Sequence, residues 1–283
     1  MVFHVVDSIS VPSDTINEDR FGHSNGCFAW VIDGATDVLE ERLLEGGSDA
    51  AWFAEAAHRA LRTAALHPPS KLCDLPGKIC EVVATQFQSA ARRKPAGGHE
   101  HPSATAIIVH AHDGRIDYAA VGDCALIAST GGGHIKVGLG GKEAGDRSTA
   151  EVVANFQAKN CEASPEDAKA YMWPRIRLQR ARINQHDGYG ALSLTPPPPH
   201  FVVSGGFEVA PGDHVLIASD GLTRLIEVYR RYEPETLLEA AVGKGLAALV
   251  AELRGIEMDD ATCRAFPRVK ARDDATGVLL RIL

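Results

Sequence analysis

The pattern of hydrophobic positions changes type several times along the first half of the chain. Short runs rich in β-branched and aromatic residues, at Val2–Val6 and Cys27–Asp33, predict strands. Two Ala-rich stretches, Ser48–Leu66 and Lys78–Arg92, carry apolar residues three and four apart, which predicts helices. Residues 103–130 then predict three strands, with an Asp-Gly hairpin signal in the first turn between them.

The second half of the chain alternates in a similar way. Helices are predicted over 149–158 and 164–182, the second interrupted by Pro174. The remaining elements are predicted in the order strand, strand, helix, helix, helix, strand, at 201–209, 214–219, 222–229, 234–242, 246–258 and 275–283. Hairpins with helices inserted in pairs favour antiparallel sheets covered by helices over repeated βαβ units. The expected fold class is therefore α+β.

Composition places the chain among ordinary globular proteins. Its 283 residues are 45% apolar and 23% charged, near the averages for folded domains, and this length suits one domain spanning 1–283. No apolar run approaches the roughly 20 residues that cross a bilayer, and no basic segment precedes an apolar stretch at the N-terminus. The six cysteines form no C-x-x-C pair, so we expect reduced thiols, a cytoplasmic location and no membrane partner.

Charge argues against a nucleic-acid partner. With 29 basic and 37 acidic residues the net charge is −8, whereas nucleic-acid binders usually present a basic face. Neither a G-x-G-x-x-G segment after a strand nor a P-loop occurs, so the usual phosphate cradles of nucleotide-binding folds are missing. The densest basic run contains Arg175, Arg177, Arg180 and Arg182. Its residues form either a solvated helix face or a docking patch for an anionic substrate.

Acidic residues recur where apolar strands begin or end. Asp33, Asp123 and Asp220 follow such strands, whereas Glu18, Asp19, Asp273 and Asp274 precede them. Asp is unfavourable within a strand, so its repeated use there suggests that these ends converge. Clustered carboxylates repel one another and stay ionised only when a cation is present. Oxygen ligands, with a carbonyl freed by an Asp-Gly step, suit Mg²⁺ or Mn²⁺.

These motifs, taken in order, resemble a known family. They are NED (17–19), FAWVIDGAT (28–36), SATAIIV (103–109), AAVGDCALI (119–127), PGDHVLIASDGL (211–222) and RDDATGVLL (272–280). The strand that ends in SDG and the terminal D-[ND]-x-T strand are the most specific of them. Together they are similar to the metal-dependent serine/threonine phosphatases of the protein phosphatase 2C type, and most closely to divergent, bacterial-like members.

The resemblance implies a four-layer α-β-β-α sandwich, with two Mn²⁺ or Mg²⁺ ions in a cleft and a variable flap at about 130–200. It implies that Asp33 bridges both ions and Gly34 binds one through its carbonyl. Asp220 and Asp273 match further ligands of one ion, and Glu18 matches a carboxylate near the other. Asp19 and Asp274 match residues that support the ligands from behind. Asp123 matches a residue that helps to hold a third, weaker metal ion. Catalysis would then run through Asp33, Asp220 and Asp273, by a water that bridges the ions and attacks phosphorus.

Three positions depart from the family pattern. Ala35 stands where many members carry a His that protonates the leaving alcohol, and Asp14 where many carry an Arg that grips phosphate. Arg224 replaces an Asp, which weakens the third metal site. Because a carboxylate cannot replace a guanidinium, substrate phosphate must be held elsewhere. The candidates are Arg20, Arg224, Arg175 and Arg177.

Three functions remain open on these grounds. The first is hydrolysis of phosphoserine or phosphothreonine in a protein substrate. The second is a binding or regulatory module that keeps the fold with little or no activity, which Ala35, Asp14 and Arg224 favour. The third is a phosphohydrolase for a small phosphorylated molecule. The retained carboxylates of Asp33, Asp220 and Asp273 oppose the second function, since a site without a metal would have no reason to keep carboxylates that repel one another.

Overall fold

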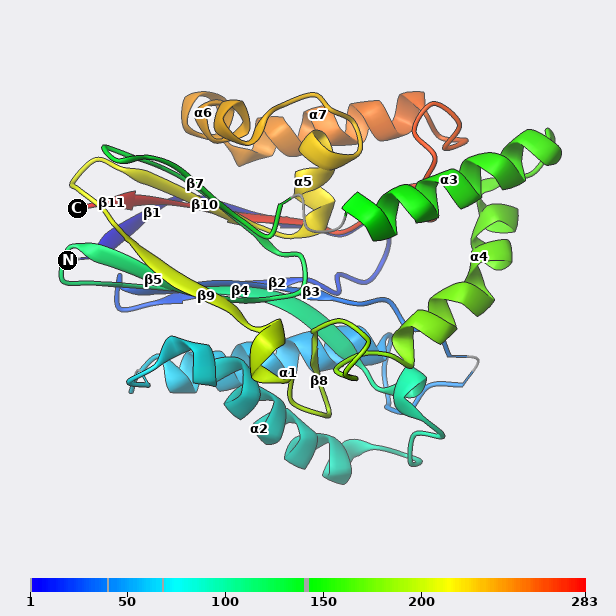
Figure 1. Ribbon diagram of the computed structural model, residues 1–283, viewed down its shortest axis with the longest axis horizontal. Helices are drawn as coiled ribbons and strands as arrows, with labels where there is room; N and C mark the ends of the chain where they lie inside the picture. Colours follow the sequence, from blue (N-terminus) through cyan, green and yellow to red (C-terminus); the bar gives the residue numbers. More distant parts are fainter. Residues whose placement is uncertain (1, 40, 68, 140–142) are drawn as a thin grey trace.

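Two antiparallel sheets lie face to face at the centre of the molecule (Figure 1). The computed structural model describes residues 2–39, 41–67, 69–139 and 143–283. The first sheet has the order β1-β11-β10-β6-β7, from β1 (Phe3–Val11), β6 (Ala125–Thr130), β7 (Gly133–Val137), β10 (His214–Ala218) and β11 (Ala275–Ile282). The second has the order β2-β3-β4-β5-β9, from β2 (Arg20–Ser24), β3 (Phe28–Gly34), β4 (Ser103–His112), β5 (Arg115–Val121) and β9 (Val203–Glu208). A short strand, β8 (Leu192–Ser193), pairs with the start of β4.

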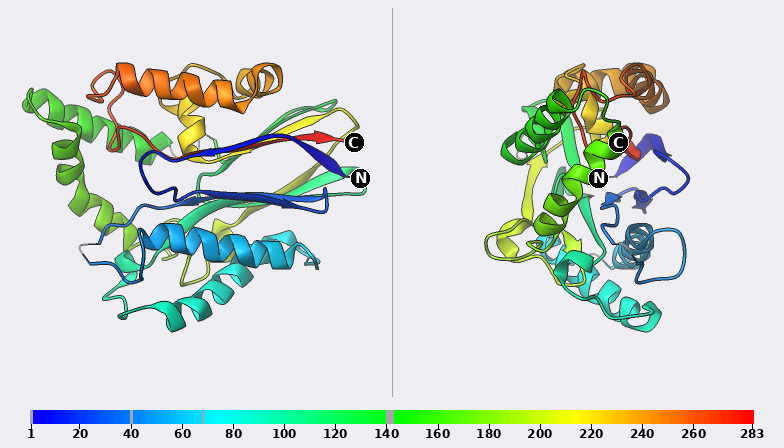
Figure 2. Two further views of the ribbon diagram at one scale, coloured as in Figure 1. Left: turned by 180° about the vertical axis from the view of Figure 1, so that it is seen from behind. Right: turned by 90° about the vertical axis from the view of Figure 1, so that its right-hand side faces the viewer.

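Helices cover the outer face of each sheet. The second sheet is covered by α1 (Asp49–Ala64) and α2 (Leu75–Ala90), and the first by α5 (Asp220–Glu227), α6 (Pro234–Lys244) and α7 (Leu246–Asp259) (Figure 1). Two further helices, α3 (Glu143–Lys159) and α4 (Pro165–Arg180), extend from one end of the sandwich (Figure 2). The predicted α+β fold with four α-β-β-α layers is thus confirmed. In the described part of the chain, no helix is both long and apolar enough to cross a membrane.

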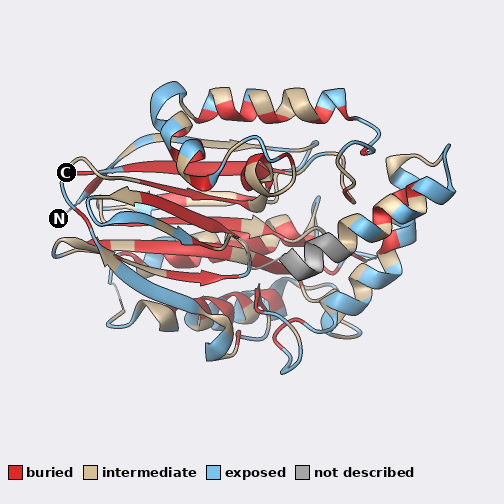
Figure 3. Ribbon diagram, turned by 45° about the horizontal axis from the view of Figure 1, so that its top comes forward, coloured by how far each residue is buried: buried red, intermediate tan, exposed pale blue. Residues whose placement is uncertain are grey.

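The core occupies three layers, which the burial colouring follows through both sheets (Figure 3). Between the sheets, alternate residues of the inner strands interdigitate, among them Val31, Ile107, Val109, Ile217, Val278 and Leu280. The opposite sides of the same strands pack against helices, so Trp30 and Ile108 meet α1 and α2. Strands buried on both faces read as continuous apolar runs, which is why β3, β4 and β10 stand out in the sequence.

Pairing register brings the ends of β3, β4, β6, β10 and β11 to one edge of the sandwich. In the second sheet Asp33 at the end of β3 lies opposite Thr105 near the start of β4. In the first sheet Ala218 at the end of β10 lies opposite Gly277 in β11 and Ala125 in β6. This edge also faces the α3–α4 segment (Figure 2). Every acidic motif found in the sequence therefore meets at a single end of the molecule.

The other predicted elements are present, but the strand predicted at 2–6 extends to Val11 and the helix predicted at 149–158 begins at Glu143. The remaining differences are one proline and strands that the sequence did not predict, among them the two-residue β8. Strands β2 and β7 were not predicted, because their short runs are largely polar and form by pairing with β3 and β6. The expected interruption at Pro174 is wrong, since α4 continues through it. Proline there removes one backbone donor, and the exposed position of Pro174 lets water satisfy the carbonyl it leaves. The single domain over 1–283 and the flap bounds stay predictions.

A buried ion pair shapes the loop between α7 and β11. The Asp260 carboxylate accepts hydrogen bonds from the backbone N–H groups of Arg264, Ala265 and Phe266, at 2.9 to 3.1 Å, and pairs with Arg268 at 2.5 Å. Burial alone would raise the pKa of Asp260, but the Arg268 pair and the three N–H donors outweigh it and lower that pKa. The loop is thereby fixed immediately before Asp273.

We expect Asp260→Asn to lower the free energy of unfolding by about 3 kcal/mol at pH 7, because it leaves the Arg268 charge buried without its partner. A lowered carboxyl pKa stabilises the fold above the unfolded value, about 3.9, and this contribution is lost as the pH falls through the native pKa. The difference in free energy of unfolding between the variant and the natural protein should therefore become smaller below about pH 4. Urea unfolding at pH 7, 4 and 3 measures it. The exposed neighbour Asp259→Asn is the control, and a gap independent of pH would contradict the prediction.

Candidate functional site

The two sheets approach each other at Asp33 and Asp220. Asp33 ends β3, and Asp220 begins α5 directly after β10, so each follows a buried apolar strand. The backbone N–H of Asp220 lies 3.4 Å from Asp33 Oδ2, which joins the sheets at this point. Burial raises the pKa of Asp33 well above its ordinary value, and the charges of nearby carboxylates raise it further, namely those of Asp19, Asp220, Asp123 and Asp273. The predicted convergence of acids is therefore present.

Asp19 is the most deeply buried acid of the group, at 2% exposure. Burial raises the pKa of its carboxyl to about 8, the hydroxyls of Thr276 and Ser219 partly oppose that rise, and Asp274 and Asp273 add to it. Its Oδ2 atom has no hydrogen-bond partner among the described residues. A buried, unsatisfied carboxylate oxygen is costly, so this atom is a place where a cation would be stabilising.

Glu18 is held by neutral donors. Its carboxylate accepts hydrogen bonds from the hydroxyl of Thr36, at 2.5 Å, and from the hydroxyl of Ser48. Its carbonyl accepts the N–H of Gly34 at 3.2 Å. A Cβ atom at position 34 would lie 2.5 Å from that carbonyl, so only glycine permits the approach. Gly34 thus fixes Glu18 beside the end of β3.

Asp274 positions the loop that carries Glu18. One of its oxygens accepts the backbone N–H of Ser13 and the other that of Glu18, both at 2.6 Å. The side chain is buried, at 6% exposure. Asp14, between these two anchored residues, is exposed. The supporting role expected of Asp274 thus has a concrete form, since its carboxylate replaces the hydrogen bonds that this irregular segment would otherwise make with water.

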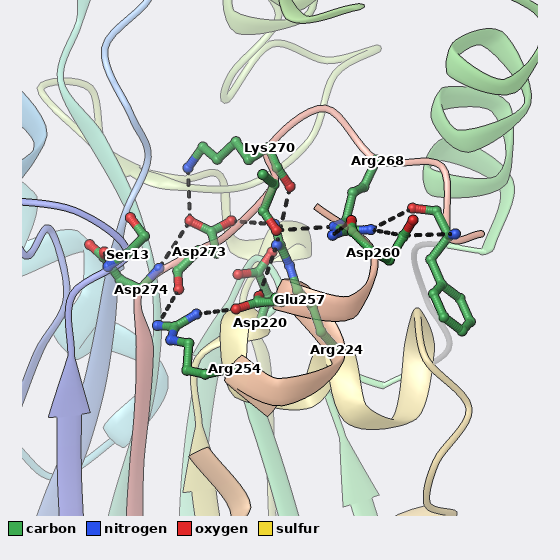
Figure 4. A network of polar contacts seen from close by, with 12 residues as sticks. Ser13, Asp220, Arg224, Arg254, Glu257, Asp260, Arg268, Lys270, Asp273 and Asp274 are labelled. Atoms are coloured by element: carbon green, nitrogen blue, oxygen red, sulfur yellow. Dashed lines mark hydrogen bonds and ion pairs between the residues drawn. The ribbon is translucent and has the colours of Figure 1, made fainter. Parts of the chain in front are cut away.

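Asp273 is surrounded by protein cations (Figure 4). Lys270 Nζ lies 2.9 Å from Oδ1, and Arg224 Nη2 lies 2.7 Å from Oδ2. Arg224 is also 3.7 Å from the wholly buried Glu257, which pairs with Arg254 at 2.6 Å. Burial disfavours the charged guanidinium, but the carboxylates, chiefly Asp273, outweigh it and raise the pKa of Arg224. The position that departs from the family pattern is therefore part of an ion-pair network.

The other predicted phosphate-binding arginines lie in different settings. Arg20 Nε pairs with Glu55 at 2.8 Å, and its Nη1 donates to the carbonyls of Asn17 and Asp19. Arg175 is exposed and Arg177 half-buried, both on α4. These contacts hold Arg20 in the structure of the N-terminal segment. Its role and those of Arg175 and Arg177 in phosphate binding stay predictions.

Arg180 ties α4 to the loop after β3. Its Nη1 donates to the carbonyl of Ala35 at 3.2 Å and to Ser103 Oγ at 3.1 Å, and its Nη2 donates to the carbonyl of Thr36 at 3.2 Å. The sequence placed Arg180 only in a basic run. Thr36, Ser48 and Lys270 were not singled out at all, because their partners lie far away in the chain. The sequence signal that could have pointed to Lys270 is the basic VKAR segment (269–272) directly before Asp273.

The donor chemistry around Asp33 fits a hard divalent cation. Glu18, Asp33 and Asp220 offer carboxylate oxygens, Gly34 offers a carbonyl, and Asp19 has an oxygen without a partner. Asp123, half-buried after β5, adds to the negative charge at Asp33. Within the described ranges, no three His, Cys, Asp or Glu side chains lie close enough together to hold an ion as they stand. Asp273 differs from the others because cations already contact both its oxygens.

The sequence profile of the protein phosphatase 2C family matches residues 11–242, and the chain belongs to this family. The crystal structure of the Mycobacterium tuberculosis serine/threonine phosphatase PstP/Ppp is similar, with a TM-score of 0.58 and 16% identity over 100% of this chain and 99% of that one. The structure of the PstP catalytic domain in complex with 2 manganese ions has a TM-score of 0.54 and 15% identity, over 99% of this chain and 98% of that one. The structure of PppA from Pseudomonas aeruginosa has a TM-score of 0.53 and 14% identity, over 100% of this chain and 99% of that one. At these identities the likeness establishes the fold. No curated protein matches the sequence.

We expect Asp274→Asn to loosen the N-terminal loop. An amide presents one acceptor oxygen and one NH₂ group, so one of the two backbone N–H groups now bonded at 2.6 Å would face a donor. Hydrogen exchange at Ser13 or Glu18 should accelerate at least about tenfold, the equivalent of roughly 1.4 kcal/mol in local opening. The matched control is Asp14→Asn in the same loop, where the side chain is exposed. Equal exchange in the two variants would show that Asp274 does not hold the loop.

Proposed function

We propose that the protein hydrolyses phosphoserine and phosphothreonine in protein substrates, in a reaction that depends on Mn²⁺ or Mg²⁺. The observation that carries the proposal is the convergence of Asp33, Glu18 and Asp220 at one end of the sandwich. Membership of the protein phosphatase 2C family supports the reaction class. The manganese ions in the PstP catalytic domain support the metal dependence.

Two groups of oxygen donors would hold the ions. Glu18, Asp33 and the Gly34 carbonyl form one group, and Asp33, Asp220 and Asp273 form the other, with Asp123 as a weaker third position. Bound divalent ions supply Lewis acidity, which lowers the pKa of water and offsets charge on phosphoryl oxygens. Asp274 would support these ligands from behind through its contacts with the loop that carries Glu18, and Asp19, whose Oδ2 has no partner among the described residues, would do so from its buried position beside Asp33.

The chain's own contacts arrange the site before substrate arrives. Hydroxyls of Thr36 and Ser48 orient Glu18, and Arg180 holds the carbonyls of Ala35 and Thr36. Ala35 itself has no proton to give, so the leaving alcohol must take its proton from solvent or from another residue. We expect activity to favour substrates whose leaving groups need little protonation.

A second candidate function is a regulatory module of the same fold with weak or no catalysis. The observation in its favour is that Lys270 and Arg224 occupy both oxygens of Asp273, one of the expected ligands. Metal-dependent release of phosphate from an aryl phosphate separates the two functions. A comparison of phosphopeptides with phosphorylated metabolites then tests for a small-molecule substrate. The expectations of a cytoplasmic location and of no nucleic-acid or membrane partner stay predictions.

Chelation provides the first test. We expect EDTA to abolish hydrolysis of an aryl phosphate and Mn²⁺ to restore it, because the clustered carboxylates then lose and regain the cations that offset their repulsion. Circular dichroism before and after chelation checks that the fold persists. Activity that stays undiminished after exhaustive chelation would exclude the proposed reaction.

The shared carboxylate provides the second test. We expect Asp33→Asn to lower kcat at least about a hundredfold, because Asp33 belongs to both proposed ligand groups. Asp113→Asn is the matched control, since it makes the same change in the exposed turn between β4 and β5. Asp113 has a φ of 42°, a conformation that Asn adopts readily. A well-folded Asp33→Asn protein with near-normal kcat would move the site elsewhere.

A further inference from the structure

The two halves of the carboxylate cluster are balanced by different kinds of groups. At Asp273, Lys270 contacts one oxygen at 2.9 Å and Arg224 contacts the other at 2.7 Å. At Glu18, the partners are the neutral hydroxyls of Thr36 and Ser48. Among the ion pairs of the described residues, none involves Glu18, Asp19 or Asp33. The negative charge is therefore offset within the protein at Asp273 and left without an ion pair on the Asp33 side.

The two cations at Asp273 differ in how firmly they are held. Arg224 has an 11% exposed side chain and is fixed from behind by Glu257, which Arg254 also contacts (Figure 4). Arg254 donates in addition to the carbonyl of Asp273 at 2.8 Å. Lys270 is 31% exposed and ends a flexible four-carbon stem. Lys270 is thus the cation that can leave without disturbing the buried network.

Lys270 also links the two halves of the carboxylate cluster. Its Nζ atom donates to Thr36 Oγ1 at 2.7 Å as well as to Asp273. Thr36 in turn donates to Glu18. The ammonium therefore bridges the loop after β3 and the segment before β11, and it lies where a cation held by Asp273 would have to come.

We propose that Lys270 and Arg224 are built-in counter-cations of Asp273, so that the two metal ions of the proposed function bind with unequal affinity. An ion held by Glu18, Asp33 and the Gly34 carbonyl displaces no cation from its ligands, since Lys270 reaches Glu18 only through Thr36, and it binds tightly. An ion held by Asp220 and Asp273 must first displace Lys270 and binds weakly. This inference rests on the proposed function and makes the occupancy of the second position depend on metal concentration.

The expected difference follows from the contact that is lost. A hydrogen bond between an ammonium and a carboxylate typically contributes enough to change a binding constant by about ten- to a hundredfold. Arg224 stays beside Asp273 and adds repulsion toward a divalent ion. The weaker ion should therefore have a dissociation constant at least about tenfold above that of the tighter one.

Metal-binding titrations test the proposal without reference to activity. We would titrate the metal-free full chain with Mn²⁺ by isothermal calorimetry, and count free Mn²⁺ in parallel by electron paramagnetic resonance. The natural protein should show one tight and one weak site. Lys270→Met, which keeps the length of the stem without its charge, should tighten the weak site at least about tenfold. The tight site should change less, because Lys270 contacts Asp273 directly and Glu18 only through Thr36.

Two further variants isolate the charge of Lys270. Lys270→Arg keeps a cation beside Asp273, so the weak site should stay weak. Lys136→Met removes an ion-paired lysine of β7, which contacts Glu235 at 2.6 Å outside the site, and both sites should then match the natural protein. If Lys270→Met folds poorly, the two unequal sites of the natural protein still test the proposal.

The outcomes separate the inference from the function on which it rests. Two equally tight sites in the natural protein, or a weak site that Lys270→Met leaves unchanged, would overturn the role of the built-in cations while the proposed function stands. A natural protein that binds no Mn²⁺ would overturn the proposed function itself. Tightening that is clearly larger at the weak site than at the tight site supports both.

Discussion

Electrostatic repulsion among buried carboxylates is the constraint around which this end of the molecule is organised. The register of both sheets directs Asp33 and Asp220 to the same edge, and burial together with the nearby carboxylates raises the pKa of Asp33. Two kinds of groups offset this negative charge. The protein places Lys270 and Arg224 at Asp273, hydroxyl donors at Glu18 and backbone N–H donors at Asp274.

Much of this arrangement was predictable from the sequence, because its signals are local. The runs that become β3, β4 and β10 are apolar on both faces, and an Asp directly after such a run marks the end of a strand. The acidic positions therefore mark one edge of the fold in the sequence alone. The edge strands β2 and β7 were missed for the opposite reason, since they are held by pairing and carry little apolar signal of their own.

The contacts that tune the site could not be predicted in this way. Thr36 and Lys270 are 234 positions apart in the chain, and Arg180 lies 145 positions from Ala35. No periodicity or turn signal connects such residues, because their meeting depends on how several irregular segments cross at the sheet edge. Arg224 illustrates the same limit. Its departure from the family pattern was visible, whereas its pairing with Asp273 required the fold.

The hydroxyl of Thr36 fixes the direction of the hydrogen bonds between Lys270 and Glu18. An ammonium can only donate, so the contact with Lys270 uses a lone pair of Thr36 Oγ1 and leaves its single proton for Glu18. The row from Lys270 through Thr36 to Glu18 is therefore polarised one way, with every O–H and N–H bond aimed at the carboxylate. Side-chain shape alone could not produce this ordering, because valine would fill the same volume and break the row at both of its links.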